Sequence, residues 1–157
     1  MKIIFLDIDG VLNSRAYDRL RDWNILSDID ETRLPLLKKL VDTTGAKIVL
    51  SSTWRAHWNE DPNLCDEDGM YINKTFAKYG LFVYSRTPLH RDYTLRKEEI
   101  KQWLNDCSEK IEAFVIIDDD QFGWGDLSPY FVKTNPNFGR GLEEKHIQEA
   151  IDILNRC

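Results

Sequence analysis

The stretch FLDIDGVLN, residues 5–13, decides how the rest of the chain is organised. It continues the short run of residues 1–4 and ends it in two carboxylates and a glycine. Side chains alternate faces along an extended strand, so Asp7 and Asp9 are expected to project to the same side. Two carboxylates that share one small space favour a bound cation or a division into acid and base. Gly10 then permits a turn that other residues make only at a cost.

The composition is that of an ordinary globular chain. Its 157 residues are 42% hydrophobic and 31% charged, which is enough for a buried core, and we expect one domain over residues 1–157. The net charge of -6 argues against a broad electrostatic footprint for nucleic acid or an anionic membrane. Such a footprint needs an excess of Lys and Arg on one face.

Cysteine usage and hydropathy indicate the compartment. The three cysteines are odd in number, widely spaced and form no Cys-x-x-Cys pair, which favours reduced thiols over disulfides or a zinc site. The first residues lack the pattern of a secretory leader, and no stretch approaches a membrane span. We therefore expect a cytoplasmic protein with no membrane partner.

Strand and helix patterns alternate along the whole chain. A strand, a crossover helix and a second strand form a right-handed unit with parallel strands, so polar residues after each strand meet at one edge of the sheet. Ligands of open α/β sheets bind at that edge. The pattern predicts a three-layer, doubly wound, Rossmann-like α/β fold around a mostly parallel five-stranded sheet. After the opening strand, we expect strands at 46–50, 81–84, 113–117 and 130–134, and helices at 32–45, 70–79, 94–104 and 143–154.

Three further groups of polar residues fall at positions suited to this edge. Ser51 directly follows the second strand and Ser52 comes next, although either hydroxyl would also serve as a helix N-cap. Arg96 and Lys97 lie in the first turn of a helix, and the sequence leaves open which of them points inward. Residues 118–120 are three aspartates at the end of the most apolar strand. Like the first strand, this strand therefore ends in carboxylates.

These residues resemble the motifs of the haloacid dehalogenase (HAD) superfamily of phosphohydrolases. FLDIDGVLN is similar to the first motif, an apolar strand that ends in Asp-x-Asp-Gly. The hydroxyl, the cation and the later aspartates occur in the order of the remaining three motifs. The stretches GVLN and SSTWR and the final Gly-Leu-Glu-Glu helix look similar to HAD domains associated with RNA-repair proteins.

The resemblance implies a magnesium-dependent phosphatase that hydrolyses a phosphate monoester through an aspartyl-phosphate intermediate. The substrate stays open between a nucleotide, a polynucleotide end, a sugar phosphate and a phosphoprotein. Asp7 would be the nucleophile, Asp9 the general acid and base, and Arg96 the cation that offsets developing charge. Phosphate binding would fall to Ser51, Ser52 and Lys97, and Mg²⁺ binding to Asp7, Asp9, Asp118 and Asp119.

The cap is expected to be minimal and the site open. Residues 14–29 have the length of a flap over the site rather than of a cap domain, and the segment between the second and third motifs is short. Two other functional classes stay open. A receiver-like phosphoacceptor module has no need of Asp9, whereas a noncatalytic nucleic-acid-binding domain would depend on Arg86, His90, Arg91, Arg96 and Lys97.

Overall fold

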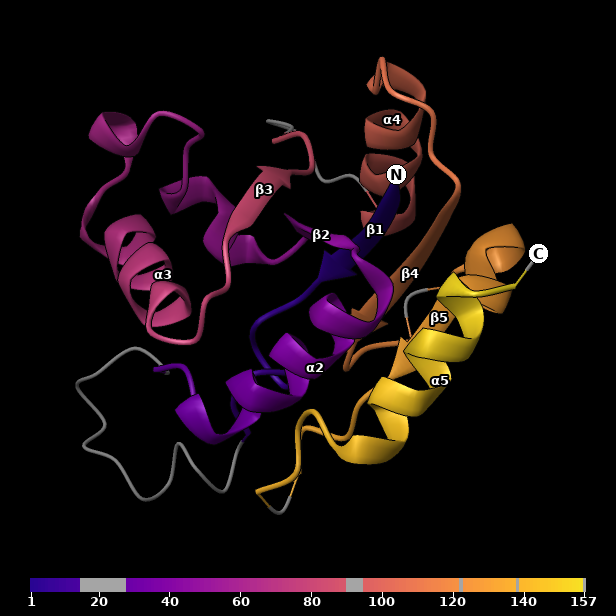
Figure 1. The fold of residues 1–157 in the computed structure, drawn as a ribbon. Helices are drawn as coiled ribbons and strands as arrows, with labels where there is room; N and C mark the ends of the chain where they lie inside the picture. The colour runs from indigo at the N-terminus through magenta and orange to yellow at the C-terminus, as the bar shows by residue number, and fades with distance from the viewer. Residues whose placement is uncertain (15–27, 90–94, 122, 138, 157) are drawn as a thin grey trace.

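A computed structural model of the chain describes residues 1–14, 28–89, 95–121, 123–137 and 139–156 (Figure 1). Five strands form one sheet in the order β3-β2-β1-β4-β5, and every pairing between neighbouring strands is parallel. The expected five-stranded sheet is confirmed, and β1 lies at its centre. The strands are β1 (Lys2–Leu6), β2 (Lys47–Leu50), β3 (Val83–Arg86), β4 (Ala113–Asp118) and β5 (Phe131–Lys133).

Helices cover both faces of the sheet and complete the three layers (Figure 1). On one face lie α2 (Leu34–Thr44), α3 (Glu67–Ala77) and α5 (Glu144–Leu154). On the other lie α4 (Arg96–Asp106) and the 3-10 helix η4 (Gly125–Tyr130). Within the described ranges, none of the helices has the length and apolarity to cross a bilayer. Three shorter 3-10 turns connect these elements, η1 (Glu31–Arg33), η2 (Thr53–His57) and η3 (Pro62–Leu64).

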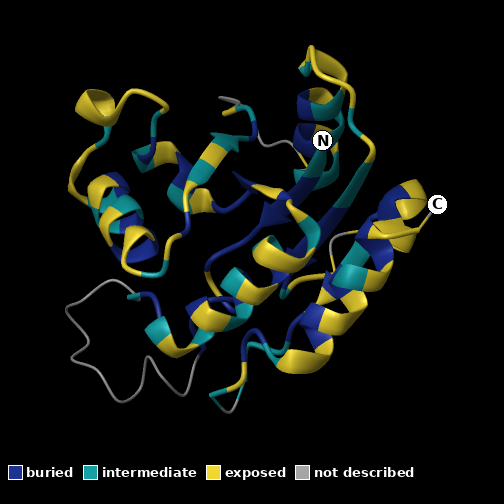
Figure 2. Cartoon of the chain, viewed as in Figure 1, coloured by how far each residue is buried: buried dark blue, intermediate teal, exposed yellow. Residues whose placement is uncertain are grey.

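The alternation of side chains along β1 explains why both faces are covered. Ile4 and Leu6 pack with α2, α3 and α5, whereas Ile3 and Phe5 pack with α4 and η4. All four side chains are fully buried, and Figure 2 shows most of β1, β2 and β4 in the colour of buried residues. Phe5 meets Trp103 of α4 edge to face, with ring centroids 5.4 Å apart. The central strand is therefore anchored on both sides up to the residue that precedes Asp7.

Some element boundaries differ from those expected. The helix expected at 70–79 begins at Glu67, because the carboxylate of Asp66 accepts hydrogen bonds from the backbone N–H groups of Asp68 and Gly69 and caps it earlier. The strand expected at 81–84 is β3, two residues later and at the edge of the sheet. The helix that carries Arg96 begins at Arg96 itself, after Leu95.

Part of the expected active-site surroundings falls outside the described residues. Residues 15–27 and 90–94 are not among them, so the expected flap over 14–29 stays a prediction. The same holds for the contributions of His90 and Arg91 to a nucleic-acid surface.

Candidate functional site

Three aspartates meet at the carboxyl edge of the sheet. Asp7 follows β1, Asp118 ends β4 and Asp119 comes directly after it. One carboxylate oxygen of each residue lies within 4.8 Å of those of the other two. Asp7 is nevertheless separated in the sequence from Asp118 and Asp119 by most of the chain. β1 and β4 are in register, with Leu6 opposite Ile117, so the residues after them reach the same level. We call Asp7, Asp118 and Asp119 the acid cluster.

Arg96 lies against the acid cluster and Lys97 does not. The Nη1 atom of Arg96 is 2.6 Å from Asp118 Oδ2 and 3.3 Å from Asp7 Oδ1. Burial alone would lower the pKa of Arg96, but the charges of Asp7 and Asp118 outweigh burial and raise it, so the guanidinium stays charged. The Nζ atom of Lys97 lies 3.1 Å from Asp126 Oδ1 in η4. The first turn of α4 therefore presents Arg96 to the acids and directs Lys97 to a surface ion pair.

The acid cluster carries more negative charge than Arg96 compensates. Burial and the neighbouring charge of Asp118 raise the pKa of Asp7 well above its ordinary value, although Arg96 opposes the shift. Burial and Asp118 also raise the pKa of Asp119 to about 6. A divalent cation would relieve this repulsion, and a set of carboxylate oxygens is what Mg²⁺ prefers. The donor chemistry and the charge imbalance both fit such an ion.

Asp9 lies at the exposed rim of the site, outside the acid cluster. Its Oδ1 accepts a hydrogen bond from Asn13 Nδ2 at 3.0 Å, and its Oδ2 accepts one from Trp54 Nε1 at 3.2 Å. Asn13 is itself held, because its Oδ1 accepts from the backbone N–H of Gly10 at 2.9 Å. Sequence reasoning did not single out Asn13 or Trp54. The only signal for them was their presence in the stretches GVLN and SSTWR.

The two candidate serines have different surroundings. Ser51 is fully buried, and its Oγ has no hydrogen-bond partner among the described residues. The Oγ of Ser52 accepts from the backbone N–H of Trp54 at 3.2 Å and caps η2. A buried hydroxyl without a partner is unfavourable, so Ser51 retains its full hydrogen-bonding capacity for a ligand, whereas Ser52 already uses one acceptor site in the local fold.

Gly10 allows the acid cluster to form. Its φ of +79° is in the left-handed region that favours glycine. A Cβ atom at this position would lie 2.3 Å from Oδ2 of Asp119. The turn after β1 therefore needs glycine both for its backbone conformation and for the close approach of Asp119.

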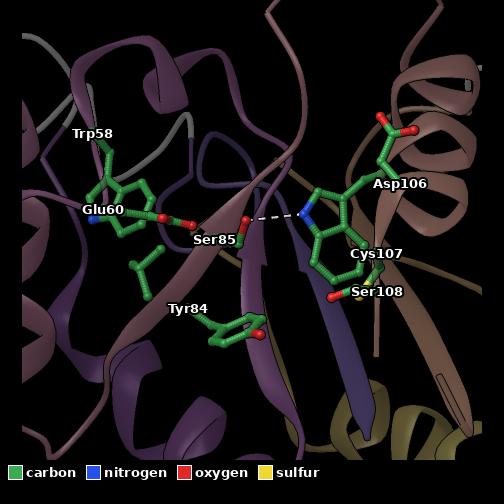
Figure 3. Close-up of a pocket in the computed structure, with 9 residues that line it drawn as sticks. Trp58, Glu60, Tyr84, Ser85, Asp106, Cys107 and Ser108 are labelled. Atoms are coloured by element: carbon green, nitrogen blue, oxygen red, sulfur yellow. Dashed lines mark hydrogen bonds between the residues drawn. The ribbon is translucent and has the colours of Figure 1, made fainter. Parts of the chain in front are cut away.

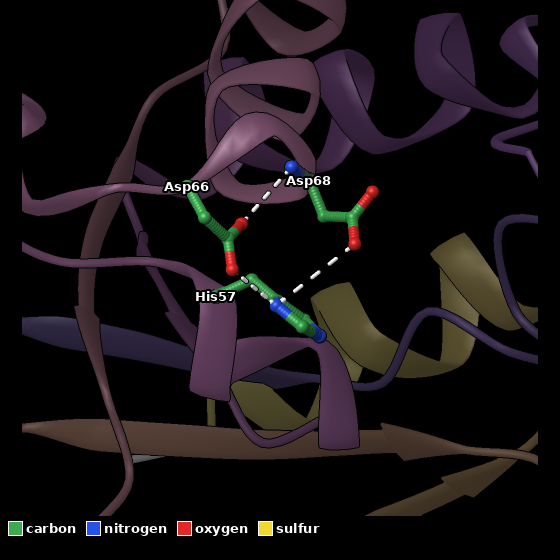
Figure 4. A group of neighbouring side chains, drawn as sticks. All are labelled: His57, Asp66 and Asp68. Carbon is green, nitrogen blue, oxygen red and sulfur yellow. Dashed lines mark hydrogen bonds and ion pairs between the residues drawn. The ribbon is translucent and has the colours of Figure 1, made fainter.

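A second group of possible metal ligands lies on the surface near the start of α3 (Figure 4). His57 Nδ1 is 2.5 Å from Asp66 Oδ2 and 3.9 Å from Asp68 Oδ2. The side chains are exposed, and Asp66 also caps α3. Helix capping and an ion pair account for this arrangement. His146 is likewise held within the fold, because its Nδ1 accepts from the backbone N–H of Glu143.

A cleft of about 600 Å³ opens beside the edge strand β3, away from the acid cluster (Figure 3). Trp58 and Trp103 contribute to its walls, and the indole N–H of Trp103 donates to Ser85 Oγ. Its charged lining residues are the acids Glu60 and Asp106. Because no lysine or arginine among the described residues lines it, this cleft is poorly suited to a phosphate group.

Comparison with known protein families gives a match over most of the chain. The family model described as "HAD domain in Swiss Army Knife RNA repair proteins" matches residues 3–147. The matched range contains the acid cluster and also Asp9, Ser51 and Arg96. No curated protein and no solved structure matches the chain.

We expect the metal-free protein to lose stability as the pH rises from about 4 to about 6. The pKa of Asp119 is about 6 in the folded state against an ordinary value of 3.8, so in this window the folded chain holds a proton that the unfolded chain has released. The stabilising contribution of Asp119 is therefore fully present below pH 3.8 and is lost as the pH rises past about 6. Urea unfolding in the presence of a chelator, repeated across this range, measures the trend.

The control for this experiment is Asp119→Asn, which should reduce the slope. Asp126 has a pKa lowered to about 2 by Lys101 and Lys97, so its opposite contribution falls below the window. Added Mg²⁺ should restore stability above the window, because the ion binds the ionised carboxylates. A stability that rises across the window in the chelated protein would contradict the prediction.

Gly10→Ala should weaken Mg²⁺ binding at least about tenfold. The added Cβ would meet Asp119 and force its carboxylate away from the cluster. Gly45→Ala is the matched control, because Gly45 also has a left-handed φ, +68°, but nothing lies within 4 Å of the added atom. Both variants should lose about 1 kcal/mol of stability from backbone strain. Calorimetric titration with Mg²⁺ should distinguish the two variants. Equal Mg²⁺ affinities of Gly10→Ala and Gly45→Ala would contradict the assignment of the acid cluster as the metal site.

Proposed function

The chain belongs to the family of HAD domains in Swiss Army Knife RNA repair proteins, and from this membership we propose that it is a magnesium-dependent phosphatase acting on a nucleic-acid end. The HAD superfamily comprises phosphohydrolases. The observation that carries the proposal is the acid cluster, in which Asp7, Asp118 and Asp119 gather at the ligand-binding edge of a parallel sheet. The aspartyl-phosphate route and the nucleic-acid end are the finer parts of this proposal.

Asp7, Asp118 and Asp119 would hold the Mg²⁺ ion. Their carboxylates are close together and mostly buried, and burial together with the charge of Asp118 raises the pKa values of Asp7 and Asp119. Asp9, which was also expected as a ligand, accepts hydrogen bonds from Asn13 and Trp54 and lies outside the acid cluster, so its part in metal binding stays a prediction. When bound, Mg²⁺ supplies positive charge that stabilises the phosphoryl oxygens in the transition state.

Asp7 is assigned the nucleophilic role. A carboxylate oxygen of Asp7 attacks the phosphorus, a new P–O bond forms, and the bond to the leaving oxygen breaks. Arg96, 3.3 Å from Asp7, is suited to offset charge on the phosphoryl oxygens. The buried hydroxyl of Ser51, with no partner among the described residues, is suited to donate a hydrogen bond to one of them.

Asp9 is assigned the proton transfers. In the first step its carboxylic acid gives a proton to the leaving oxygen, so the substrate departs as an alcohol. The resulting carboxylate then takes a proton from water, which attacks the phosphorus of the aspartyl-phosphate, releases phosphate and regenerates Asp7. Asn13 and Trp54 contact one oxygen each and would keep the Asp9 side chain in a single orientation.

Asp7→Asn should abolish phosphate release, by about a thousandfold or more, because the amide is not a nucleophile. The assay is magnesium-dependent phosphate release from a panel that contains p-nitrophenyl phosphate, nucleotides and oligonucleotides with terminal phosphates. Asp42→Asn is the control, since Asp42 is exposed on α2 and pairs only with Lys38 among the described residues.

The same experiment separates the proposed enzyme from its rivals. Activity of Asp7→Asn comparable to the parent would remove Asp7 from the nucleophilic role. A stable phosphoenzyme that does not turn over would instead favour a receiver-like phosphoacceptor. Salt-sensitive RNA binding without any hydrolysis by the parent would favour a noncatalytic nucleic-acid-binding domain.

Trp54→Phe should lower kcat about tenfold and change KM by less than about twofold. The variant keeps most of the ring but loses the indole N–H that donates to Asp9, so the proton-transfer group is less well oriented. Trp58→Phe is a matched control, because its indole N–H donates to Asn73 Oδ1 at 2.9 Å, apart from the acid cluster. Steady-state kinetics on p-nitrophenyl phosphate measures both. Equal losses in the two variants would show that Trp54 has only a structural role.

A further inference from the structure

A cavity of about 420 Å³ adjoins the acid cluster at the carboxyl end of β5. Asp119 belongs both to the cluster and to the cavity wall, so the two spaces are neighbours. Thr134 fixes the position of this wall, because its Oγ1 donates to the backbone carbonyl of Gly10 at 2.8 Å and its backbone N–H donates to the carbonyl of Asp118. One wall of the cavity is thus hydrogen-bonded to the turn after β1, which also positions the carboxylates of the acid cluster.

Two lysines line this cavity. Lys133 lies opposite Asp118 in the strand register, is exposed, and makes no ion pair with any residue that the structure describes. Lys145 lies in the first turn of α5, with its Nζ 3.7 Å from Glu143 Oε2. The neighbouring Glu144 is already paired with Lys39. The ammonium groups are therefore only weakly compensated by carboxylates of the fold.

Neutral donors complete the wall. The Oδ1 atom of Asn135 accepts from the backbone N–H of Asn137 at 2.9 Å, which leaves its NH₂ group for a ligand. His146 accepts a backbone hydrogen bond at Nδ1, so the neutral ring carries its hydrogen on Nε2. Burial lowers the pKa of His146, which favours the neutral ring. Apart from Asp119, which belongs to the acid cluster, the charged residues of this lining are the two lysines, whereas those of the cleft beside β3 are acids.

We propose that this cavity binds a second phosphate group of the substrate, next to the phosphate that is hydrolysed. The inference rests on the proposed function, because it takes the acid cluster as the place of the first phosphate. Lys133 and Lys145 supply the charge, and Asn135 and His146 supply further hydrogen bonds. The second phosphate is the phosphodiester next to the end in a nucleic-acid strand, or a second monoester in a nucleoside bisphosphate.

The test compares lysine variants on substrates with one phosphate and with two. Lys133→Gln, Lys145→Gln and the double variant are assayed on p-nitrophenyl phosphate, a nucleoside bisphosphate and a terminally phosphorylated dinucleotide. We expect kcat/KM on the two-phosphate substrates to fall about tenfold for each lysine removed, because each loses a charge-assisted hydrogen bond. Activity on p-nitrophenyl phosphate should stay within about twofold of the parent.

Lys110→Gln is the matched control. Lys110 is an exposed lysine shortly before β4, so it lies at the amino ends of the strands, opposite the carboxyl ends where the acid cluster is found. Its substitution therefore reproduces the change in net charge alone. It should leave all three substrates unaffected. A loss confined to the dinucleotide would identify the phosphodiester as the bound group, and a loss confined to the bisphosphate would identify the monoester. Equal losses on all substrates, or none on those with two phosphates, would overturn the proposal.

A binding experiment keeps this proposal separate from the proposed function. The Asp7→Asn protein, with and without the two lysine substitutions, is titrated with a fluorescent, terminally phosphorylated dinucleotide at several salt concentrations. The substitutions should weaken binding and lower the slope of log affinity against log salt by about 0.7 for each lysine. If binding depends on the lysines but the parent protein hydrolyses no substrate, the proposed phosphatase activity is wrong and the proposed phosphate-binding cavity is retained. Unchanged affinity would sink the phosphate site.

Discussion

The central constraint on the candidate site is the mutual repulsion among carboxylates at the ends of two adjacent parallel strands. Asp7 and Asp118 are held side by side because β1 and β4 pair in register, and the ladder continues to the site itself, where the backbone N–H of Asp7 donates to the carbonyl of Ile117. Burial, together with the neighbouring charge of Asp118, raises the pKa values of Asp7 and Asp119. Arg96 offsets part of the repulsion, and the remaining charge is what a divalent cation would neutralise.

Such an arrangement persists only where the surrounding fold holds it in place. β1 is packed on both faces by fully buried side chains, so the position of its last residue does not relax away from the repulsion. Gly10 contributes in a different way, since the absence of a Cβ lets Asp119 approach the turn after β1. Unfavourable local electrostatics are thus maintained by favourable packing elsewhere, as is common at functional sites.

A buried ion pair joins the two segments that carry Ser51 and Arg96. The Nη2 atom of Arg55 is 2.9 Å from Oε1 of Glu99, which lies one turn beyond Arg96 on α4. The same guanidinium donates through Nη1 to the backbone carbonyl of Ser52. Removal of one partner would leave a buried charge without compensation, so the pair favours one relative position of the two segments. The segments that carry the hydroxyl and the cation of the site are in this way linked by the Arg55–Glu99 ion pair.

The sequence by itself determined the fold class and the edge of the sheet at which the functional residues gather. Apolar strands that end abruptly in acids or hydroxyls, separated by amphipathic helices, are local patterns, and parallel strands must bring their carboxyl ends to one edge. The tertiary structure decided which of two neighbours faces the site. Arg96 and Lys97 differ by about 100° around the helix axis, and Ser51 and Ser52 differ by one step along the chain, so only packing distinguishes them. Trp54 became visible as a partner of Asp9 for the same reason, because a hydrogen bond between distant segments leaves no periodic trace in the sequence. Asn13 lies only four residues after Asp9, but its contact depends on the turn that follows β1.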